Sequence, residues 1–221
     1  MKLHIRLAAI AAFAISARLF AGPIILSNDL TEPNQNIDSL TTTTWHGISF
    51  TTDNNAYTLD TVTLFMELGG GTAAASVAAV GAPAAADTPE VDLYSDNGGV
   101  PGTLIAALAA IGTPNFSLQN IDFAGGGNAL AANSTYWIVL RALSGEVSWG
   151  FAADNLGSGI GFTDVWAETA DSGATWAAHA NDQPDQAEVT ADLVGVPEPS
   201  TLLMTGVGFL ALAGVVRRRF V

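Results

Sequence analysis

The sequence contains no cysteine and few basic residues. The absence of cysteine excludes disulfide bonds and the attachment of a lipoprotein anchor. Only seven residues are Lys or Arg, and Arg141 alone among them lies between residues 22 and 196, a segment with 20 Asp and Glu residues. The resulting net charge of −19 repels nucleic acid and acidic membrane surfaces. An acidic surface also keeps a protein soluble in a saline extracellular medium, so the negative charge does not require a binding function.

The segment between residues 22 and 196 also lacks an amphipathic helix of ordinary length. Apolar and polar residues alternate over 61–68, 136–141 and 147–151, which is the period of a strand with one buried face. A dense cluster of turn-forming residues, Ser95–Gly102, separates two further short strands. We therefore expect an all-β fold, an antiparallel β-sandwich of jelly-roll-like arrangement.

One insertion interrupts the strand pattern. Residues Gly69–Ala86 are almost entirely Gly, Ala and Pro, with no period and little to bury, so they are predicted to form a mobile surface loop. An alanine helix is the alternative, but Gly81 and Pro83 would cut it short.

The N-terminal residues have the pattern of a secretory signal peptide. Lys2 and Arg6 precede the apolar stretch Leu7–Ile15, and small residues follow it. A signal anchor is the rival interpretation, but nine apolar residues are too few to span a membrane. Arg18 lies late in this segment, so cleavage could follow Ala14, Ala17 or Ala21. We favour Ala21, which makes residues 1–21 the signal peptide, and expect residues 22–195 to form one surface domain.

The C-terminal segment, residues 196–221, has three parts in order. A proline-rich stretch comes first, the apolar run Thr201–Val216 follows, and three arginines come next. Sixteen helical residues reach only about 24 Å, which is short of the roughly 20 residues that cross a bilayer. A permanent single span and a buried core helix are the alternatives, and the arginines disfavour the core helix. The residues expected to act in sorting and processing are Val196, Pro197, Glu198, Pro199 and Ser200, and those expected to set membrane orientation are Arg217, Arg218 and Arg219.

Together these three parts resemble the PEP-CTERM sorting signal of Gram-negative bacteria. The resemblance implies that an exosortase, a membrane-embedded cysteine transpeptidase, cuts near Pro197-Glu198-Pro199. The protein would then pass through the secretion machinery, be held briefly in the inner membrane by a short transmembrane helix, and end at the cell surface or in the extracellular matrix. Proteins with such a tail are associated with exopolysaccharide production and biofilm formation.

A second resemblance covers most of residues 24–180. Short motifs in this region are similar to the choice-of-anchor R domain of bacterial surface proteins, a family that brings no established catalytic residues. The motifs are Ser49–Thr52, Asn55–Leu59, Val62–Leu64, Val91–Leu104, Leu130–Leu140 and Val147–Trp149. The insertion at 69–86 departs from the family pattern.

Two groups of residues are candidates for ligand binding. Asp92, Asp96 and Asn97 resemble half of a calcium loop, although position twelve is Thr103 rather than glutamate, and a hairpin turn explains the same residues without metal. No other cofactor is expected. His46 and His179 show no metal-ligand spacing, so no zinc site and no catalytic residue is predicted from them.

The second group consists of tryptophans. Trp149 is predicted to lie in the core, because it shares a strand face with Val147 and Phe151. Trp166 and Trp176 lie among small and polar residues, where an exposed indole could stack on a sugar ring. Core filling is the alternative for both rings.

Three function classes follow from these observations. The leading hypothesis is an exported, non-enzymatic surface or matrix protein associated with exopolysaccharide. The alternative is a carbohydrate-binding module that uses Trp166 and Trp176. The third is a glycan hydrolase, which would need two suitably placed carboxylates among the 20 of the domain. The expected partners are an exosortase-type enzyme, the secretion machinery and extracellular polysaccharide, and nucleic acid is not expected.

Overall fold

The computed structural model describes residues 22–69 and 87–194, and within these ranges the chain forms strands and no helix. All of the pairings between named strands are antiparallel. The all-β prediction is therefore confirmed. The strands are β1 (Ile24–Asn28), β2 (Asn34–Leu40), β3 (Trp45–Thr51), β4 (Tyr57–Leu68), β5 (Thr88–Asp96), β6 (Pro101–Ala110), β7 (Gln119–Ala124), β8 (Ala129–Leu130), β9 (Thr135–Ser144), β10 (Val147–Ala152), β11 (Phe162–Thr169), β12 (Ala177–Ala180) and β13 (Ala187–Leu193).

Several sequence predictions fall outside the described residues. They are the signal peptide, residues 70–86 of the glycine- and alanine-rich insertion, and the sorting segment with its apolar helix. Within 22–69 and 87–194, the structure contains no helix long and apolar enough to cross a membrane.

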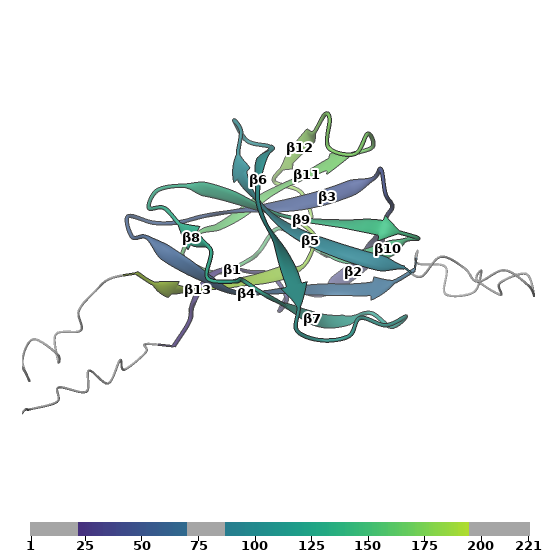
Figure 1. Cartoon of the computed structure of the whole chain (residues 1–221), viewed down its shortest axis with the longest axis horizontal. Coiled ribbons are helices and arrows are strands. Elements are labelled where there is room, and N and C mark those ends of the chain that lie inside the picture. The colour runs from purple at the N-terminus through teal and green to yellow at the C-terminus, as the bar shows by residue number, and fades with distance from the viewer. Residues whose placement is uncertain (1–21, 70–86, 195–221) are drawn as a thin grey trace, which may run out of the picture. The chain divides into compact units, whose positions relative to one another are not determined.

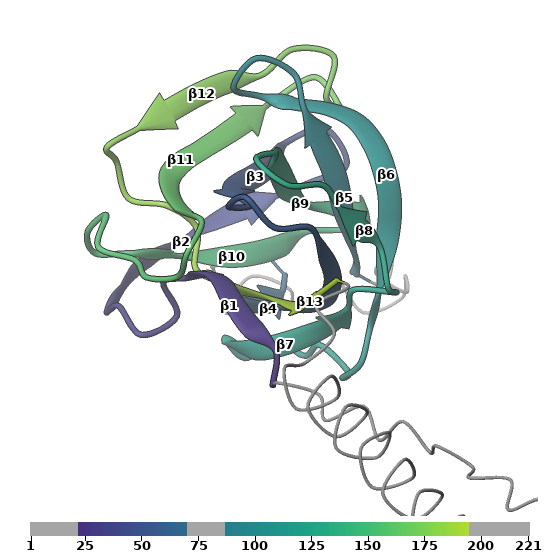
Figure 2. The same ribbon diagram turned by 90° about the vertical axis from the view of Figure 1, so that its left-hand side faces the viewer.

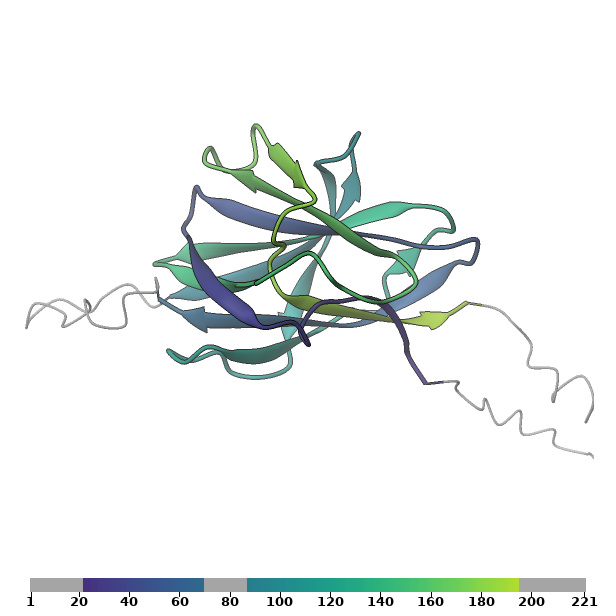
Figure 3. The ribbon, with the colours of Figure 1, turned by 180° about the vertical axis from the view of Figure 1, so that it is seen from behind.

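The strands follow one continuous hydrogen-bonded path, β1-β13-β4-β7-β6-β5-β9-β3-β11-β12, with β10 pairing β2 and β4, and β8 pairing β4 (Figure 1). Strand β6 pairs with β5 over most of its length and with β7 at its C-terminal end, so it joins two groups of strands. Figure 2 shows β3, β5, β9 and β11 on one side, and β4, β10 and β13 on the other. Seen from behind, β1 runs beside β13 (Figure 3).

The main hydrophobic core draws residues from both groups of strands. On β4 the side chains of Val62, Leu64 and Met66 are buried while those between them are partly exposed, so the predicted alternation is confirmed. Trp149 on β10 is fully buried, as predicted, and its Nε1 donates a hydrogen bond to the Gln186 carbonyl over 2.9 Å. The core thus contains a large aromatic ring whose polar atom is satisfied.

Strand β9 differs from the prediction of one buried face. Tyr136, Ile138 and Leu140 face the core, but Trp137 and Val139 on the opposite face are also buried. The physical reason is a second apolar cluster on the outer face of this part of the sheet, built from neighbouring strands and loops. Its members are Trp137, Val139 and Ala167, with Trp45, Tyr94, Val165 and Trp176 packed against them.

Candidate functional site

A groove lies on the outer face of the sheet, beside the second apolar cluster. One wall comes from the hairpin between β5 and β6 and the other from the connection between β11 and β12; both stand at the top of Figure 1. Its volume is about 480 Å³, within the range of roughly 300–1,000 Å³ that is usual for ligand pockets. Trp176 lines one wall, while Asp96, Asn97 and Thr103 line the other. The groove therefore sets an aromatic ring opposite polar side chains.

The connection that carries Trp176 is held by one carboxylate. Asp171 accepts hydrogen bonds from the Thr169 hydroxyl at 2.7 Å and from the backbone N–H and hydroxyl of Thr175 at 2.9 and 2.7 Å. These hydrogen bonds lower the pKa of Asp171 to about 2, and the bond from Thr169 has the largest effect. The carboxylate therefore stays ionised and keeps its partners. Trp176 then meets the edge of Trp45, with ring centroids 6.4 Å apart.

The opposite wall is a tight turn. Asp96 accepts the backbone N–H groups of Gly98 and Gly99 and the Nε1–H of Trp137, at 3.0, 3.1 and 2.8 Å. Both glycines have positive φ, and the N–H of Asn97 donates to the Val100 carbonyl at 2.9 Å. The hairpin turn predicted from the sequence is present, and the carboxylate of Asp96 organises it.

Asp92, the third residue of the predicted calcium set, lies apart from the turn. It is fully buried on the outer face of β5, where the Nε of Arg141 donates to it over 3.2 Å. Arg141 also pairs with Glu90 and lies over the Trp45 ring, 4.8 Å from its centroid. Burial raises the pKa of Asp92, Glu90 adds to the rise, and Arg141 opposes it. The calcium site itself stays a prediction.

A second cluster lies on the inner face, around His46 of β3. The β3–β11 register pairs His46 with Glu168, and the β11–β12 register pairs Trp166 with His179. Because residues two apart on a strand share a face, both histidines, Trp166 and Glu168 point to the same side. The sequence showed no motif linking the histidines, because strand register brings them together rather than spacing along the chain.

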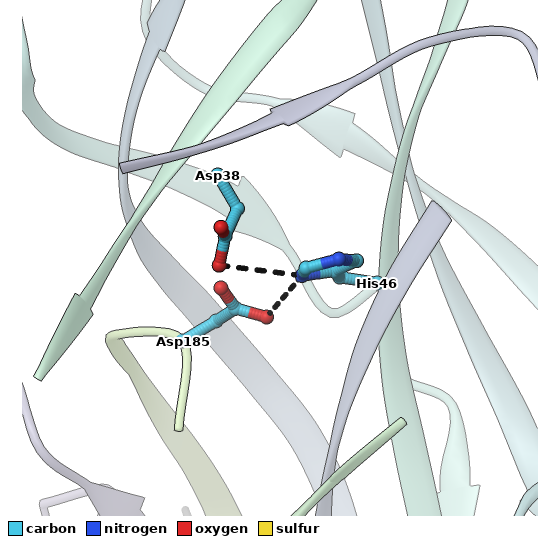
Figure 4. A group of neighbouring side chains, drawn as sticks. All are labelled: Asp38, His46 and Asp185. Carbon is cyan, nitrogen blue, oxygen red and sulfur yellow. Dashed lines mark hydrogen bonds and ion pairs between the residues drawn. The ribbon is translucent and has the colours of Figure 1, made fainter. Parts of the chain in front are cut away.

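Carboxylates surround the His46 ring. Its Nδ1 lies 3.1 Å from Asp185 Oδ2 and 3.7 Å from Asp38 Oδ2 (Figure 4). Its Nε2 lies 3.8 Å from Glu168 Oε2. The other oxygen of Glu168 is 3.2 Å from Nε2 of His179. Burial lowers the pKa of His46, but Asp185, Asp38 and Glu168 outweigh it, so the pKa is raised. Burial, helped by Asp185, raises the pKa of Asp38 to about 6.

The two tryptophans predicted to stack on sugar are not brought together. Trp166 packs against the main core from the inner face, stacked on His179 at 4.2 Å and tilted against His46 at 5.2 Å between centroids. Trp176 belongs to the outer cluster and lines the groove. A sugar-binding role for either ring stays a prediction, and the groove favours Trp176.

Residues 195–219 match the PEP-CTERM protein-sorting motif. The resemblance inferred for residues 196–221 is thereby confirmed, and Pro197, Glu198 and Pro199 lie inside the match. This motif implies an exported protein that an exosortase processes at the membrane before it reaches the cell surface. The described residues, 22–69 and 87–194, lie outside the match, and no curated protein sequence matches the chain.

Proposed function

We propose that residues 22–194 form a non-enzymatic surface or matrix domain of a Gram-negative bacterium, which holds a neutral exopolysaccharide in the groove beside Trp176. The observation that carries this proposal is the pairing of a half-buried indole with a polar wall across the same groove. A sugar ring has an apolar face and a rim of hydroxyl groups, so it can stack on an indole while its hydroxyl groups reach polar side chains. Asn97 and Thr103 are exposed on the wall that faces Trp176.

Charge decides the class of polysaccharide. The described part of the chain carries 20 acidic residues and, among lysine and arginine, Arg141 alone, and Arg141 is already paired with Glu90 and Asp92. An anionic polymer such as a uronate-rich glycan would meet repulsion over the whole domain. A neutral polymer meets none, so the proposal is limited to neutral glycans.

The groove lining supports binding rather than hydrolysis. Glycoside hydrolysis generally uses two carboxyl groups, roughly 5–9.5 Å apart, on either side of the scissile bond. Among the groove-lining residues of the described chain, Asp96 is the one that carries a carboxylate, and it is engaged by Gly98, Gly99 and Trp137. Retention of polymer in a biofilm matrix requires no bond cleavage.

The finer description of the fold belongs to the same proposal. The two groups of strands that enclose the main core are proposed to form a jelly-roll-like sandwich. Such a fold would agree with the resemblance of residues 24–180 to the choice-of-anchor R domain, which stays a hypothesis. Fold alone would not assign the function, because sandwiches host binding modules and enzymes alike.

The test is a glycan array that carries neutral and anionic oligosaccharides, probed with the purified protein and two variants. Trp176→Ala removes the stacking face, whereas Trp176→Phe keeps a smaller aromatic one. Wild type should bind neutral glycans, Trp176→Ala should lose at least tenfold in affinity, and Trp176→Phe should retain most of it. Equal binding by Trp176→Ala would exclude the groove, and release of reducing sugar from a bound glycan would show an enzyme instead.

A further inference from the structure

The inner-face cluster has the composition of a metal site. One ligand atom each from Asp38, His46 and Asp185 can be chosen so that all three lie within 4.8 Å of one another. Figure 4 shows the two carboxylates converging on the same edge of the imidazole. We propose that Asp38, His46 and Asp185 bind one divalent transition-metal ion, a site separate from the groove on the outer face.

The distances suit such an ion. Ligand atoms about 2.0–2.2 Å from a metal, set at tetrahedral or octahedral angles, lie roughly 3–3.5 Å from each other. The His46 Nδ1 is 3.1 Å from Asp185 Oδ2 and 3.7 Å from Asp38 Oδ2. These two spacings are close to those between ligands on one ion, and the three chosen ligand atoms all lie within 4.8 Å of one another.

Asp185 supplies an independent sign of a ligand. Its side chain is 2 % exposed, and its Oδ1 is buried without a hydrogen-bond partner among the described residues. A buried carboxylate oxygen normally has a partner, because desolvation without one is costly. A cation bound between Asp185 and Asp38 would compensate this buried carboxylate, whose Oδ1 has no partner, and would offset the repulsion between the two carboxylates.

The orientation of His46 also fits. Glu168 lies 3.8 Å from Nε2, where it can hold a proton on that nitrogen once a bound ion has displaced the proton that Nδ1 shares with Asp185. A carboxylate on the far nitrogen is the usual second partner of a metal-bound histidine. Trp166 packs against the ring, 5.2 Å between centroids, and limits its rotation.

The backbone fixes Asp185 from both sides. The Pro184 carbonyl accepts the N–H of Ala152 at 2.9 Å, and the N–H of Gln186 donates to the Gly150 carbonyl at 2.7 Å. Asp38 provides access for an ion, since 39 % of its side chain is exposed. The site is therefore rigid on its buried side and open on the other.

The ligand set selects the class of metal. One imidazole nitrogen with two carboxylates suits zinc or manganese, and water can fill the remaining positions. Calcium takes six to eight oxygen ligands and is not normally coordinated by an imidazole nitrogen. Zinc is the probe of choice, with calcium as the comparison.

The experiment measures zinc bound to chelator-stripped protein by equilibrium dialysis and mass spectrometry. Asp38→Asn weakens a half-exposed ligand, and Asp122→Asn, an exposed residue of β7, removes the same charge elsewhere. Wild type and Asp122→Asn should each bind one zinc per chain, Asp38→Asn should bind at least tenfold more weakly, and calcium should not compete. Zinc binding that is absent from wild type, or equal in both variants, would overturn the proposal.

A second measurement on the unmodified protein guards against misfolding of the variant. In ¹⁵N-histidine spectra, zinc should shift the Nδ1 signal of His46 strongly and the His179 signals weakly. A shift confined to His179 would place the metal elsewhere and overturn the assignment. Unshifted His46 signals would show that the carboxylates serve only to hold the buried imidazole.

Discussion

His46 and Asp185 are 139 residues apart in the chain, yet the Nδ1 of the imidazole lies 3.1 Å from Oδ2 of the carboxylate. His46 belongs to β3, which pairs β9 and β11, whereas Asp185 lies two residues before β13, which pairs β1 and β4. The contact therefore ties together the two groups of strands that enclose the core. Both side chains are almost fully buried, so each depends on the other for a partner.

This dependence predicts a non-additive pair of substitutions. In chelator, Asp185→Leu or His46→Leu alone should each lower the free energy of unfolding by about 3–5 kcal/mol, because one buried polar partner is left alone. The double variant should lose less than the sum, with a coupling of about 0.5–3 kcal/mol. Urea denaturation of wild type, the two single variants and the double variant measures this coupling as a double-mutant cycle. Additive losses would mean that the two groups contribute to stability independently.

A glycine controls the aromatic wall of the groove. Gly173 has φ +82°, and a Cβ placed there would lie 2.8 Å from the Trp45 ring. Gly173→Ala should therefore cost about 1–3 kcal/mol of stability and weaken glycan binding by displacing Trp45 from Trp176. Gly112→Ala is the matched control, since nothing lies within 4 Å of that position. Identical denaturation midpoints for the two variants would contradict the prediction.

The local strand pattern could be predicted from the sequence, but the cluster around His46 could not. Alternation along β4 and the turn residues between β5 and β6 are local signals, and both predictions are confirmed. The histidine cluster depends on the registers of β3, β11 and β12, and on the path of the chain before β13. Short-range patterns carry no information on such long-range pairings.

The aromatic residues illustrate the same limit. Trp166 and Trp176 lie in similar polar sequence contexts, yet one ring packs between two histidines and the other lines a groove on the opposite face. Trp137 is buried on the outer face of β9 because Trp45 and Trp176 arrive there from distant segments. Whether a tryptophan ring is buried therefore depends on which distant segments pack against it. The residues next to the tryptophan in sequence do not indicate those contacts.

A buried carboxyl group predicts pH-dependent stability. Burial raises the pKa of Asp29 to about 8, from an ordinary value of 3.8, so the folded protein holds a proton that the unfolded chain has released. The contribution of Asp29 to the free energy of unfolding should be greatest below about pH 4. It should fall as the pH rises toward 8 and level off above that value. Asp29→Asn keeps a side-chain oxygen that can accept the Ala187 N–H, but asparagine does not titrate. The substitution should therefore remove the loss of stability that Asp29 causes as the pH rises.

The measurement is urea denaturation of wild type and Asp29→Asn at pH 5, 7 and 9 in chelator. The difference between the two proteins should grow with pH, by at most on the order of 5 kcal/mol. Asp122→Asn, which changes an exposed carboxylate, controls for the loss of one charge. A difference that stays constant from pH 5 to 9 would show that Asp29 titrates normally in the folded state.

The sorting motif predicts a separation of export from processing. Changing Pro197 and Pro199 to alanine should block C-terminal cleavage while leaving export intact, because the two prolines of the matched sorting motif would be lost and the signal peptide would be unchanged. Immunoblots of membrane and released fractions should show the precursor accumulating in the membrane. Pro114→Ala, outside the motif, is the control. Normal release of the double variant would show that cleavage does not depend on the proline pair.

The last prediction separates calcium binding from plain charge screening. With one internal cation against 20 acids, the domain repels itself, so its melting temperature should rise with sodium chloride and level off as the screening length falls below about 8 Å. At matched ionic strength, calcium should raise the melting temperature no more than sodium does. The reason is that Asp96 already accepts three N–H groups and Asp92 is paired with Arg141. Matched melting curves measure this, with Asp96→Asn as the diagnostic variant. A larger effect of calcium that Asp96→Asn abolishes would establish the calcium site, because a ligand that binds only the folded state stabilises it beyond screening.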